Sequence, residues 1–454
     1  MPAGKIVRAC VIVCALGGAL GIAANAPAVG NGPNLFGFAN PTGISRTYKV
    51  NGAIDFDNAF FQSLGTNGRS CGSCHQPGDG WTIVPSHVQA RFEATNGEDP
   101  IFRSNDGSNA PTADASTSEA RRSAYSMLLT KGLIRVGIGM PVNAEFELVD
   151  ADDPYGYASA TELSLFRRPL PSTNLAFLAT VMWDGRETFP DKSIHFDLSD
   201  QANGATLGHA AAINPLSPDQ RDAIVKFETG LFTAQAVDTT AGILNTRGGA
   251  GGPMALSRQP FHIGINDVLS PGFNPRAFTL FDTWQNLSSS ERDPYTEARE
   301  AVARGQEIFN SRGFTIADVR GVNDVLGVAA LAATCTTCHD TPNVGNHSTS
   351  LPLDLGLTTA AVRTPDMPLY TFRNRTTGEV VQTTDPGRAL ITGKWRHMST
   401  FKGPILRGLA ARAPYFHNGL AATLADVVEF YNRRFNIGLG PKDKSDLVAF
   451  LSAL

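Results

Sequence analysis

The chain has 454 residues, more than one ordinary core accommodates, and two domains are therefore expected. Hydrophobic residues make up 42% and charged residues 18%, which is typical of a globular protein and argues against a fibrous or disordered chain. Because 38 Lys and Arg nearly balance 42 Asp and Glu, the formal charge is only -4, and nucleic acid is not expected as a partner.

The first 28 residues have the features of a secretory signal peptide. Lys5 and Arg8 precede the apolar run ACVIVCALGGALGIAA, and small residues suited to cleavage follow in ANAPA. A retained membrane anchor is the alternative, but the run is short for a bilayer span. We therefore expect a mature protein that is exported to the periplasm and has no stable membrane span.

Helical patterns dominate the rest of the chain. Ser217, Pro218 and Gln220 form a helix start with a capping box, and apolar residues continue at helical spacing to position 231. Further helical patterns occupy 296–310, 423–435 and 446–454. Polar or glycine-rich stretches predict loops at 103–117 and 245–254. The sequence therefore predicts a mainly α protein with long irregular loops.

The order Cys-x-x-Cys-His occurs twice, in RSCGSCHQPG and in ATCTTCHDTP. The residues concerned are Cys71, Cys74, His75, Cys335, Cys338 and His339. This order is the attachment sequence of a c-type haem, in which both thiols add to vinyl groups and the imidazole lies beneath the iron. His75 and His339 are therefore the expected iron ligands.

Three other interpretations of these motifs remain open. Cys10 and Cys14 leave with the signal peptide, so two local disulfides would also use all four remaining cysteines. A thioredoxin-like redox pair needs a strand before it, and neither stretch offers a clear one. A zinc site shared by four cysteines leaves the two histidines unexplained. We favour two covalently attached haems.

Other motifs suggest a family. MWDGRE lies in the first half, and TTDPGRALITGKW, FKGPILRGLAARAPYFHNG and TLADVVEFYN follow the second Cys-x-x-Cys-His. In these motifs the chain resembles the bacterial di-haem cytochrome c peroxidases and the related MauG enzymes. The resemblance implies two cytochrome c-like haem domains, which we place at 29–294 and 295–454. It also implies that hydrogen peroxide meets the N-terminal haem, while the C-terminal haem receives electrons from a small donor protein such as a cytochrome c or a cupredoxin.

The resemblance assigns roles to residues of the first half. Trp183 in MWDGRE matches the family's tryptophan between the haems, a candidate electron relay, and a packed core aromatic is the alternative. Gln201 resembles the family's pocket glutamine. The family's acid-base glutamate has no counterpart, but His209 lies near its expected place, and an imidazole can move protons near neutral pH. We take His209 as the candidate acid-base residue, with a surface or helix-capping role as the alternative.

The sixth ligand of the C-terminal iron has several candidates. Tyr431 in VVEFYN matches the position where MauG enzymes present a tyrosine and the peroxidases present a methionine. Met398 is the second candidate for this ligand, and His417 is the third. Tyr431 also falls on the apolar stripe of its helix, so a core role is the alternative. We favour Tyr431 as the ligand.

Two family features find no match. The family's calcium site uses an asparagine about fifteen residues before the tryptophan, where this chain has Arg168, and a cation does not ligate calcium. Calcium is therefore a doubtful cofactor. The peroxidases also close the N-terminal iron with a second histidine, for which the stretch after His75 offers only His87. We expect an open N-terminal iron.

The sequence thus predicts an exported di-haem oxidoreductase that reduces hydrogen peroxide at the His75 haem. MauG-like oxidation of a protein or an organic substrate is the alternative that Tyr431 favours. A di-haem electron carrier, with six ligands on both irons and no turnover, is the alternative outside the enzymes.

Overall fold

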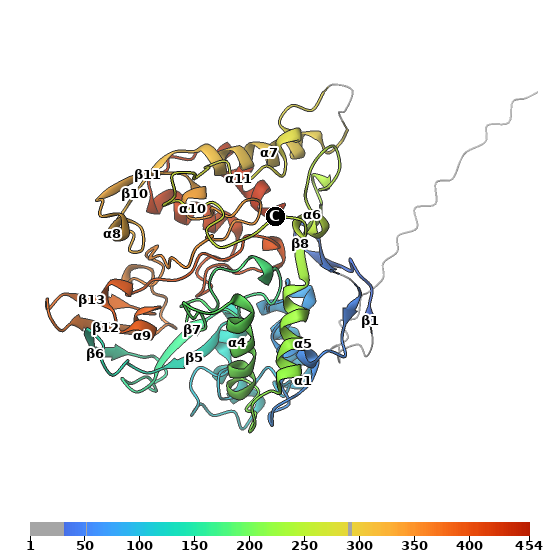
Figure 1. Ribbon diagram of the computed structural model, residues 1–454. Helices are drawn as coiled ribbons and strands as arrows, with labels where there is room; N and C mark the ends of the chain where they lie inside the picture. The colour runs from blue at the N-terminus through green and yellow to red at the C-terminus, as the bar shows by residue number, and fades with distance from the viewer. Residues whose placement is uncertain (1–30, 51, 289–292) are drawn as a thin grey trace, which may run out of the picture.

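The computed structural model describes residues 31–50, 52–288 and 293–454 (Figure 1). The predicted signal peptide at 1–28 lies outside these residues. Within the described ranges, no helix is both long enough and apolar enough to cross a membrane.

Eleven α-helices occur in the described part of the chain, and several of them are short. In the view of Figure 1, α1, α4 and α5 lie in the lower half of the molecule, whereas α7, α10 and α11 lie in the upper half. The bounds are α1 (Pro85–Thr95), α2 (Ser118–Ala124), α3 (Ser126–Lys131), α4 (Ile194–Gly208), α5 (Pro218–Thr229), α6 (Pro253–Leu256), α7 (Thr296–Ser311), α8 (Asn323–Leu326), α9 (Ala389–Thr392), α10 (Leu424–Arg434) and α11 (Pro441–Ser452).

The helix starts that the sequence predicts are present. At α5, the amide of Gln220 donates to the hydroxyl of Ser217, and the amide of Ser217 donates to the Gln220 side chain. Thr423 and Asp426 make the same reciprocal pair before α10. The predicted helices near these caps are confirmed, as is the one that forms α7. The closing helix α11 begins earlier than predicted, at Pro441, a residue suited to a first turn.

Five small antiparallel sheets accompany the helices in the described residues, and the helical prediction did not include them. The largest has the strand order β2-β3-β8-β9, and another has the order β13-β12-β6. The strands are β1 (Asn31–Gly32), β2 (Gly37–Asn40), β3 (Gly43–Lys49), β4 (Ile54–Asp55), β5 (Ile134–Ile138), β6 (Phe146–Asp152), β7 (Leu163–Arg167), β8 (Leu231–Asp238), β9 (Gly242–Ile243), β10 (Phe314–Ala317), β11 (Ala330–Ala333), β12 (Leu369–Asn374) and β13 (Val380–Thr383). The pairing of β6 with β12 joins the first and second halves of the sequence.

The largest apolar cluster surrounds α7 and α11. Phe278 meets Phe309 edge to face, with ring centroids 5.3 Å apart. The two helices cross at Gly305, where an added Cβ would lie 1.9 Å from the carbonyl oxygen of Asp446, so only glycine permits this approach. The close crossing places Phe309 and Leu451 on the wall of one cavity, which also receives the second Cys-x-x-Cys-His motif.

Candidate functional site

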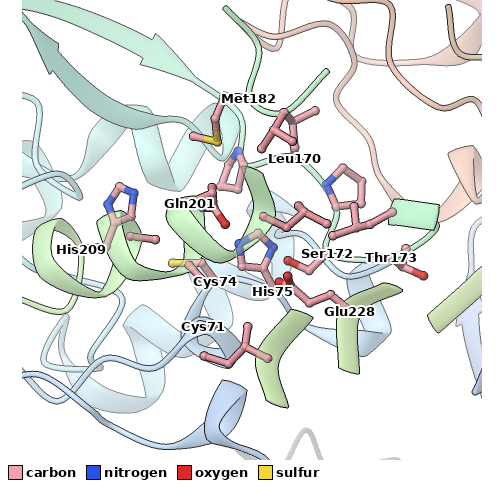
Figure 2. Close-up of a pocket in the computed structure, with 18 of the residues that line it drawn as sticks. Cys71, Cys74, His75, Leu170, Ser172, Thr173, Met182, Gln201, His209 and Glu228 are labelled. Carbon is pink, nitrogen blue, oxygen red and sulfur yellow. The ribbon is translucent and has the colours of Figure 1, made fainter. Parts of the chain in front are cut away.

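The first Cys-x-x-Cys-His motif forms a tight turn over Cys71–Ser73, which Cys74 ends and His75 follows. The amides of Cys74 and His75 donate to the carbonyl of Cys71 at 3.1 and 3.0 Å. The amide of Ser70 donates to the hydroxyl of Ser73 at 3.0 Å and closes the turn. As Figure 2 shows, the turn brings Cys71, Cys74 and His75 to one cavity, the first cavity.

The second motif repeats this structure. Its turn spans Cys335–Thr337, and the amides of Cys338 and His339 donate to the carbonyl of Cys335 at 3.3 and 3.2 Å. The amide of Thr334 donates to the hydroxyl of Thr337 at 3.0 Å. These cysteines and this histidine line a second cavity, whose walls are mainly apolar and include side chains from α7, α10 and α11. Two distant segments thus build the same local structure, each at its own cavity.

Each of the two histidines keeps one ring nitrogen free to bind a metal. The Nδ1 atom of His75 lies 3.0 Å from the carbonyl oxygen of Trp81, and Nδ1 of His339 lies 2.7 Å from that of Gly345. A carbonyl oxygen only accepts, so Nδ1 carries the proton and Nε2 keeps its lone pair. Burial lowers the pKa of His75 to about 4 and also lowers that of His339, so both rings are neutral.

The four cysteines fit covalent attachment of a group better than the alternatives. All four are free thiols, and burial raises the pKa of Cys71, Cys335 and Cys338 to about 12, unlike the low-pKa thiol of a thioredoxin-like pair. Among the described residues, no three His, Cys, Asp or Glu side chains gather so that they could hold a metal ion. Each cavity therefore offers two thiols and one neutral imidazole, the donor set of a c-type haem.

Helix α4, which the sequence analysis did not predict, supplies one wall of the first cavity. Gln201 and His209 both line this cavity, together with Met182 (Figure 2). Nδ1 of His209 makes a short contact with Asp106, and the other oxygen of Asp106 pairs with the buried Arg69. Burial acts to raise the pKa of Asp106, but His209 and Arg69 lower it overall, so the carboxylate is ionised. No sequence motif marks Asp106, which orients the His209 ring and leaves Nε2 available.

Trp183 stands between the two cavities. Only Trp183, Lys402 and Pro404 line both of them among the described residues. The indole nitrogen of Trp183 donates to the carbonyl of Arg168 at 2.8 Å, and its ring meets that of His417 edge to face with centroids 6.0 Å apart. The indole is therefore held in one orientation within the dividing wall.

Of the three candidate sixth ligands, two line the second cavity and one does not. Tyr431 on α10 lines the second cavity with His339, and burial raises its pKa above the usual range. Met398 lies instead in a core cluster with Phe146 and Trp395 and does not line either cavity. His417 also lines the second cavity, and its ring stacks on that of Phe401 with centroids 4.0 Å apart. Burial lowers the pKa of His417 to about 4, so its ring is neutral.

His87 and Arg168, which the sequence analysis raised for closure of the iron and for calcium, have structural partners. His87 lies in the first turn of α1, contacts Asp79 and does not line the first cavity. The Arg168 guanidinium donates to the carbonyls of Lys131, Ile83 and Arg412 at 2.8, 2.7 and 3.1 Å. The positively charged side chain of Arg168 thus already forms hydrogen bonds with these carbonyl oxygens.

The chain is similar in sequence to known cytochrome c peroxidases. No family model matches the chain. It is 32% identical over 134 residues to cytochrome-c peroxidase IdrP2 of Denitromonas iodatirespirans, which covers 26% of this chain and 35% of that protein. It is 30% identical over 193 residues to cytochrome-c peroxidase IdrP1 of a Pseudomonas species (strain SCT), which covers 38% of this chain and 49% of that protein.

Over these segments the chain is similar to bacterial cytochrome c peroxidases. The matched segments span about a third to a half of the length of these peroxidases. A solved MauG-like protein associated with microbial copper homeostasis aligns over 94% of this chain and 93% of its own, with 14% identity and a TM-score of 0.40.

A buried ion cluster fixes the MWDGRE motif. The Arg167 guanidinium pairs with Asp184 at 2.5 Å and with both oxygens of Asp385 at 2.7 and 2.9 Å. All three side chains are at most 2% exposed. Asp184 directly follows Trp183, and Asp385 belongs to TTDPGR in the second half. The cluster therefore ties the dividing wall to the C-terminal half of the chain.

Glu228 is a buried acid at the first cavity, near His75 and Ser172 in Figure 2. Burial raises its pKa from 4.5 to about 8, against a smaller lowering by Ser172, so the carboxyl is protonated at neutral pH. The unfolded chain loses this proton above about pH 4.5, whereas the folded chain holds it until about pH 8. The contribution of Glu228 to stability therefore falls as the pH rises through this window.

Replacing Glu228 with Gln should remove this pH dependence. We expect the free energy of unfolding of the variant to vary less between about pH 5 and 8 than that of the parent, with the largest gain at the alkaline end. Denaturant titrations of the loaded protein at several pH values measure the effect, with the exposed Glu98→Gln as the control. Parallel pH profiles for the parent and Glu228→Gln would contradict the buried-acid assignment.

Proposed function

We propose that this protein is an exported di-haem oxidoreductase that reduces hydrogen peroxide. One observation carries the proposal: two cavities each present a Cys-x-x-Cys-His turn with a neutral imidazole and a free Nε2, and Trp183 lies in the wall between them. The relationship to cytochrome c peroxidases supports it. The overall reaction takes two electrons and two protons and converts one peroxide to two waters.

The cofactors in this proposal are two covalently attached c-type haems. Cys71 and Cys74 would bind the first, and Cys335 and Cys338 would bind the second. We place them in an N-terminal haem domain at 29–294 and a C-terminal one at 295–454, although apolar packing crosses this boundary, since Phe278 and Trp284 join the core of α7 and α11. Calcium is not part of the proposal, because the Arg168 guanidinium holds the carbonyl oxygens near the wall.

The first cavity has the groups that peroxide reduction needs. His75 would hold the first haem, which when bound would supply peroxide binding and O–O cleavage. His209 can take a proton at Nε2 from the bound peroxide and return it to the departing oxygen. Asp106 keeps the ring oriented through Nδ1 during this transfer. The Gln201 amide offers a donor and an acceptor to position the substrate.

His339 would hold the haem that exchanges electrons with the donor, and Trp183, which lines both cavities, is the residue we propose as the electron relay. The donor we propose is a small redox protein such as a cytochrome c or a cupredoxin. Such a donor shares the compartment to which the signal peptide predicted at 1–28 would direct this protein, the periplasm. Attachment of both haems through thioethers would agree with export, because it would leave none of these four thiols free in an oxidising compartment.

Tyr431 favours a second candidate function, the MauG-like oxidation of a protein or organic substrate. A phenolate ligand stabilises oxidised iron, whereas a thioether raises the potential. We expect Tyr431→Phe to change the electronic spectrum and raise the reduction potential of the C-terminal haem, while the N-terminal haem keeps its spectrum. Met398→Leu, a buried substitution outside both cavities, is the matched control. A Tyr431→Phe spectrum identical to the parent's would make Tyr431 a core residue.

Turnover with peroxide tests the proposed function. The purified holoprotein is mixed with hydrogen peroxide and an excess of reduced cytochrome c or cupredoxin, and oxidation of the donor is followed. Many turnovers support peroxide reduction. A long-lived oxidised state without donor turnover would favour the MauG-like function. If neither haem reacts with peroxide, the proposed enzymatic functions are wrong and the protein is a di-haem electron carrier.

A further inference from the structure

Lys402 occupies an unusual place in the wall between the cavities. It lines both of them and is only 9% exposed. Its amide donates to the carbonyl of Trp183 at 2.9 Å, which fixes its backbone beside the indole. Pro404, the other residue of this segment that lines both cavities, has no charge or donor to offer. Lys402 is therefore the cation placed to act on both sites.

The ammonium group of Lys402 makes fewer hydrogen bonds to the described residues than it has donors. Nζ donates to the carbonyl of Thr180 at 2.9 Å, and this is its one hydrogen bond within the described residues. An ammonium has three donors, so two remain. No carboxylate in the described ranges pairs with it, and burial accordingly lowers its pKa to about 7. A buried cation of this kind is costly unless an anion accompanies it.

The acids around the first cavity cannot compensate this charge. Asp106 is committed to Arg69 and His209, and Glu228 is protonated at neutral pH. Arg168 and Arg412, two further buried cations on this cavity, are also held by carbonyl oxygens rather than carboxylates. The wall therefore has an excess of positive charge that a bound anionic group would balance.

We propose that Lys402 anchors both haems by donating one hydrogen bond to a propionate carboxylate in each cavity. The inference rests on the proposed function for the presence of the haems. Each haem brings two carboxylates, and charge-assisted hydrogen bonds of ammonium to carboxylate are among the strong ones. Two free donors and two adjoining cavities match this assignment. Lys402 is thus a positioning residue that also sets the electrostatic potential at both irons.

Removing the charge should lower both reduction potentials. A positive charge near an iron disfavours its oxidised state, so an uncharged side chain at this position stabilises the ferric form of each haem. The variant Lys402→Met keeps a flexible buried side chain of similar length without the charge. Lys402→Arg keeps the charge, and Lys394→Met removes a lysine from the exposed surface, where it pairs with Glu145.

The test is a spectroelectrochemical titration of both haems in the loaded protein and its variants. We expect both midpoint potentials to fall in Lys402→Met, to stay near the parent values in Lys394→Met and to be largely retained in Lys402→Arg. Resonance Raman bands of the propionate groups should shift in Lys402→Met. Unchanged potentials, or a shift of one haem alone, would overturn the shared anchor.

The failure of this inference is distinguishable from failure of the proposed function. Haem content is measured first, by the absorbance of the pyridine complexes. A parent protein that carries no haem would refute the proposed function and with it the anchor. A parent with two haems but no peroxide turnover would refute the enzymatic activity alone, because the potentials of the Lys402 variants can still be read.

Discussion

Replacing His209 with Ala is expected to lower peroxide turnover by about 10²–10⁴-fold, the usual contribution of a general acid-base residue. His209 lines the first cavity with His75, and Asp106 holds its Nδ1, so Nε2 is the atom free to exchange a proton. The haem content and the spectrum of the His339 haem should stay unchanged. Steady-state kinetics with hydrogen peroxide and a reduced donor measure the loss.

A matched histidine makes this experiment specific. His87 also contacts a buried aspartate through Nδ1, but it does not line the first cavity. We expect His87→Ala to keep near-parental turnover. Asp106→Asn should lower kcat while His209 remains, because an amide can donate to Nδ1 and leave the ring proton on Nε2, which then cannot accept one. Equal turnover in His209→Ala and His87→Ala would show that His209 is not the acid-base residue.

Replacing Asp385 with Asn is expected to destabilise the folded protein by about 3–5 kcal/mol, as when one partner of a buried ion pair is removed. Arg167 would keep Asp184 but lose a bidentate partner inside the protein. The loss should be visible as a lower denaturant midpoint of the loaded protein. Asp152→Asn, which removes an exposed partner of Arg363, is the control and should cause a much smaller change.

The same cluster makes the free energy of unfolding depend on pH, and the protein loses stability as the pH falls. Burial acts to raise the pKa of Asp184, but Arg167 and Arg186 lower it to about 2, from 3.8 in the unfolded chain. A lowered acid pKa stabilises the folded state above the unfolded pKa, and this stabilisation is lost as the pH falls toward 2. Equal destabilisation by Asp385→Asn and Asp152→Asn would contradict the role assigned to the cluster.

Local chemistry explains what the sequence could predict. Cys71, Cys74 and His75 are neighbours in the chain, so their spacing alone indicates the turn that the structure contains. The caps at Ser217 and Thr423 are likewise set by residues three positions apart. Tyr431 could be placed on a helical stripe, and that stripe faces the second cavity.

Long-range contacts explain what the sequence could not predict. Asp106 lies far from His209 in the chain, and nothing near either residue signals the pair. Strand β7 is buried at all five positions, so it lacks the alternation that marks a half-buried strand. Lys402 sits beside Trp183 only because distant segments meet. Met398 was a rival iron ligand by residue type, but the fold buries it in another core.

The state of the two irons tests the central claim most directly. Electron paramagnetic resonance of the oxidised holoprotein, recorded before and after addition of hydrogen peroxide, reports which iron is open. We predict one high-spin haem that reacts with peroxide and one closed, six-coordinate haem, and we predict that Cys71→Ser with Cys74→Ser removes the reactive signal. Two low-spin haems whose signals peroxide leaves unchanged would contradict the account.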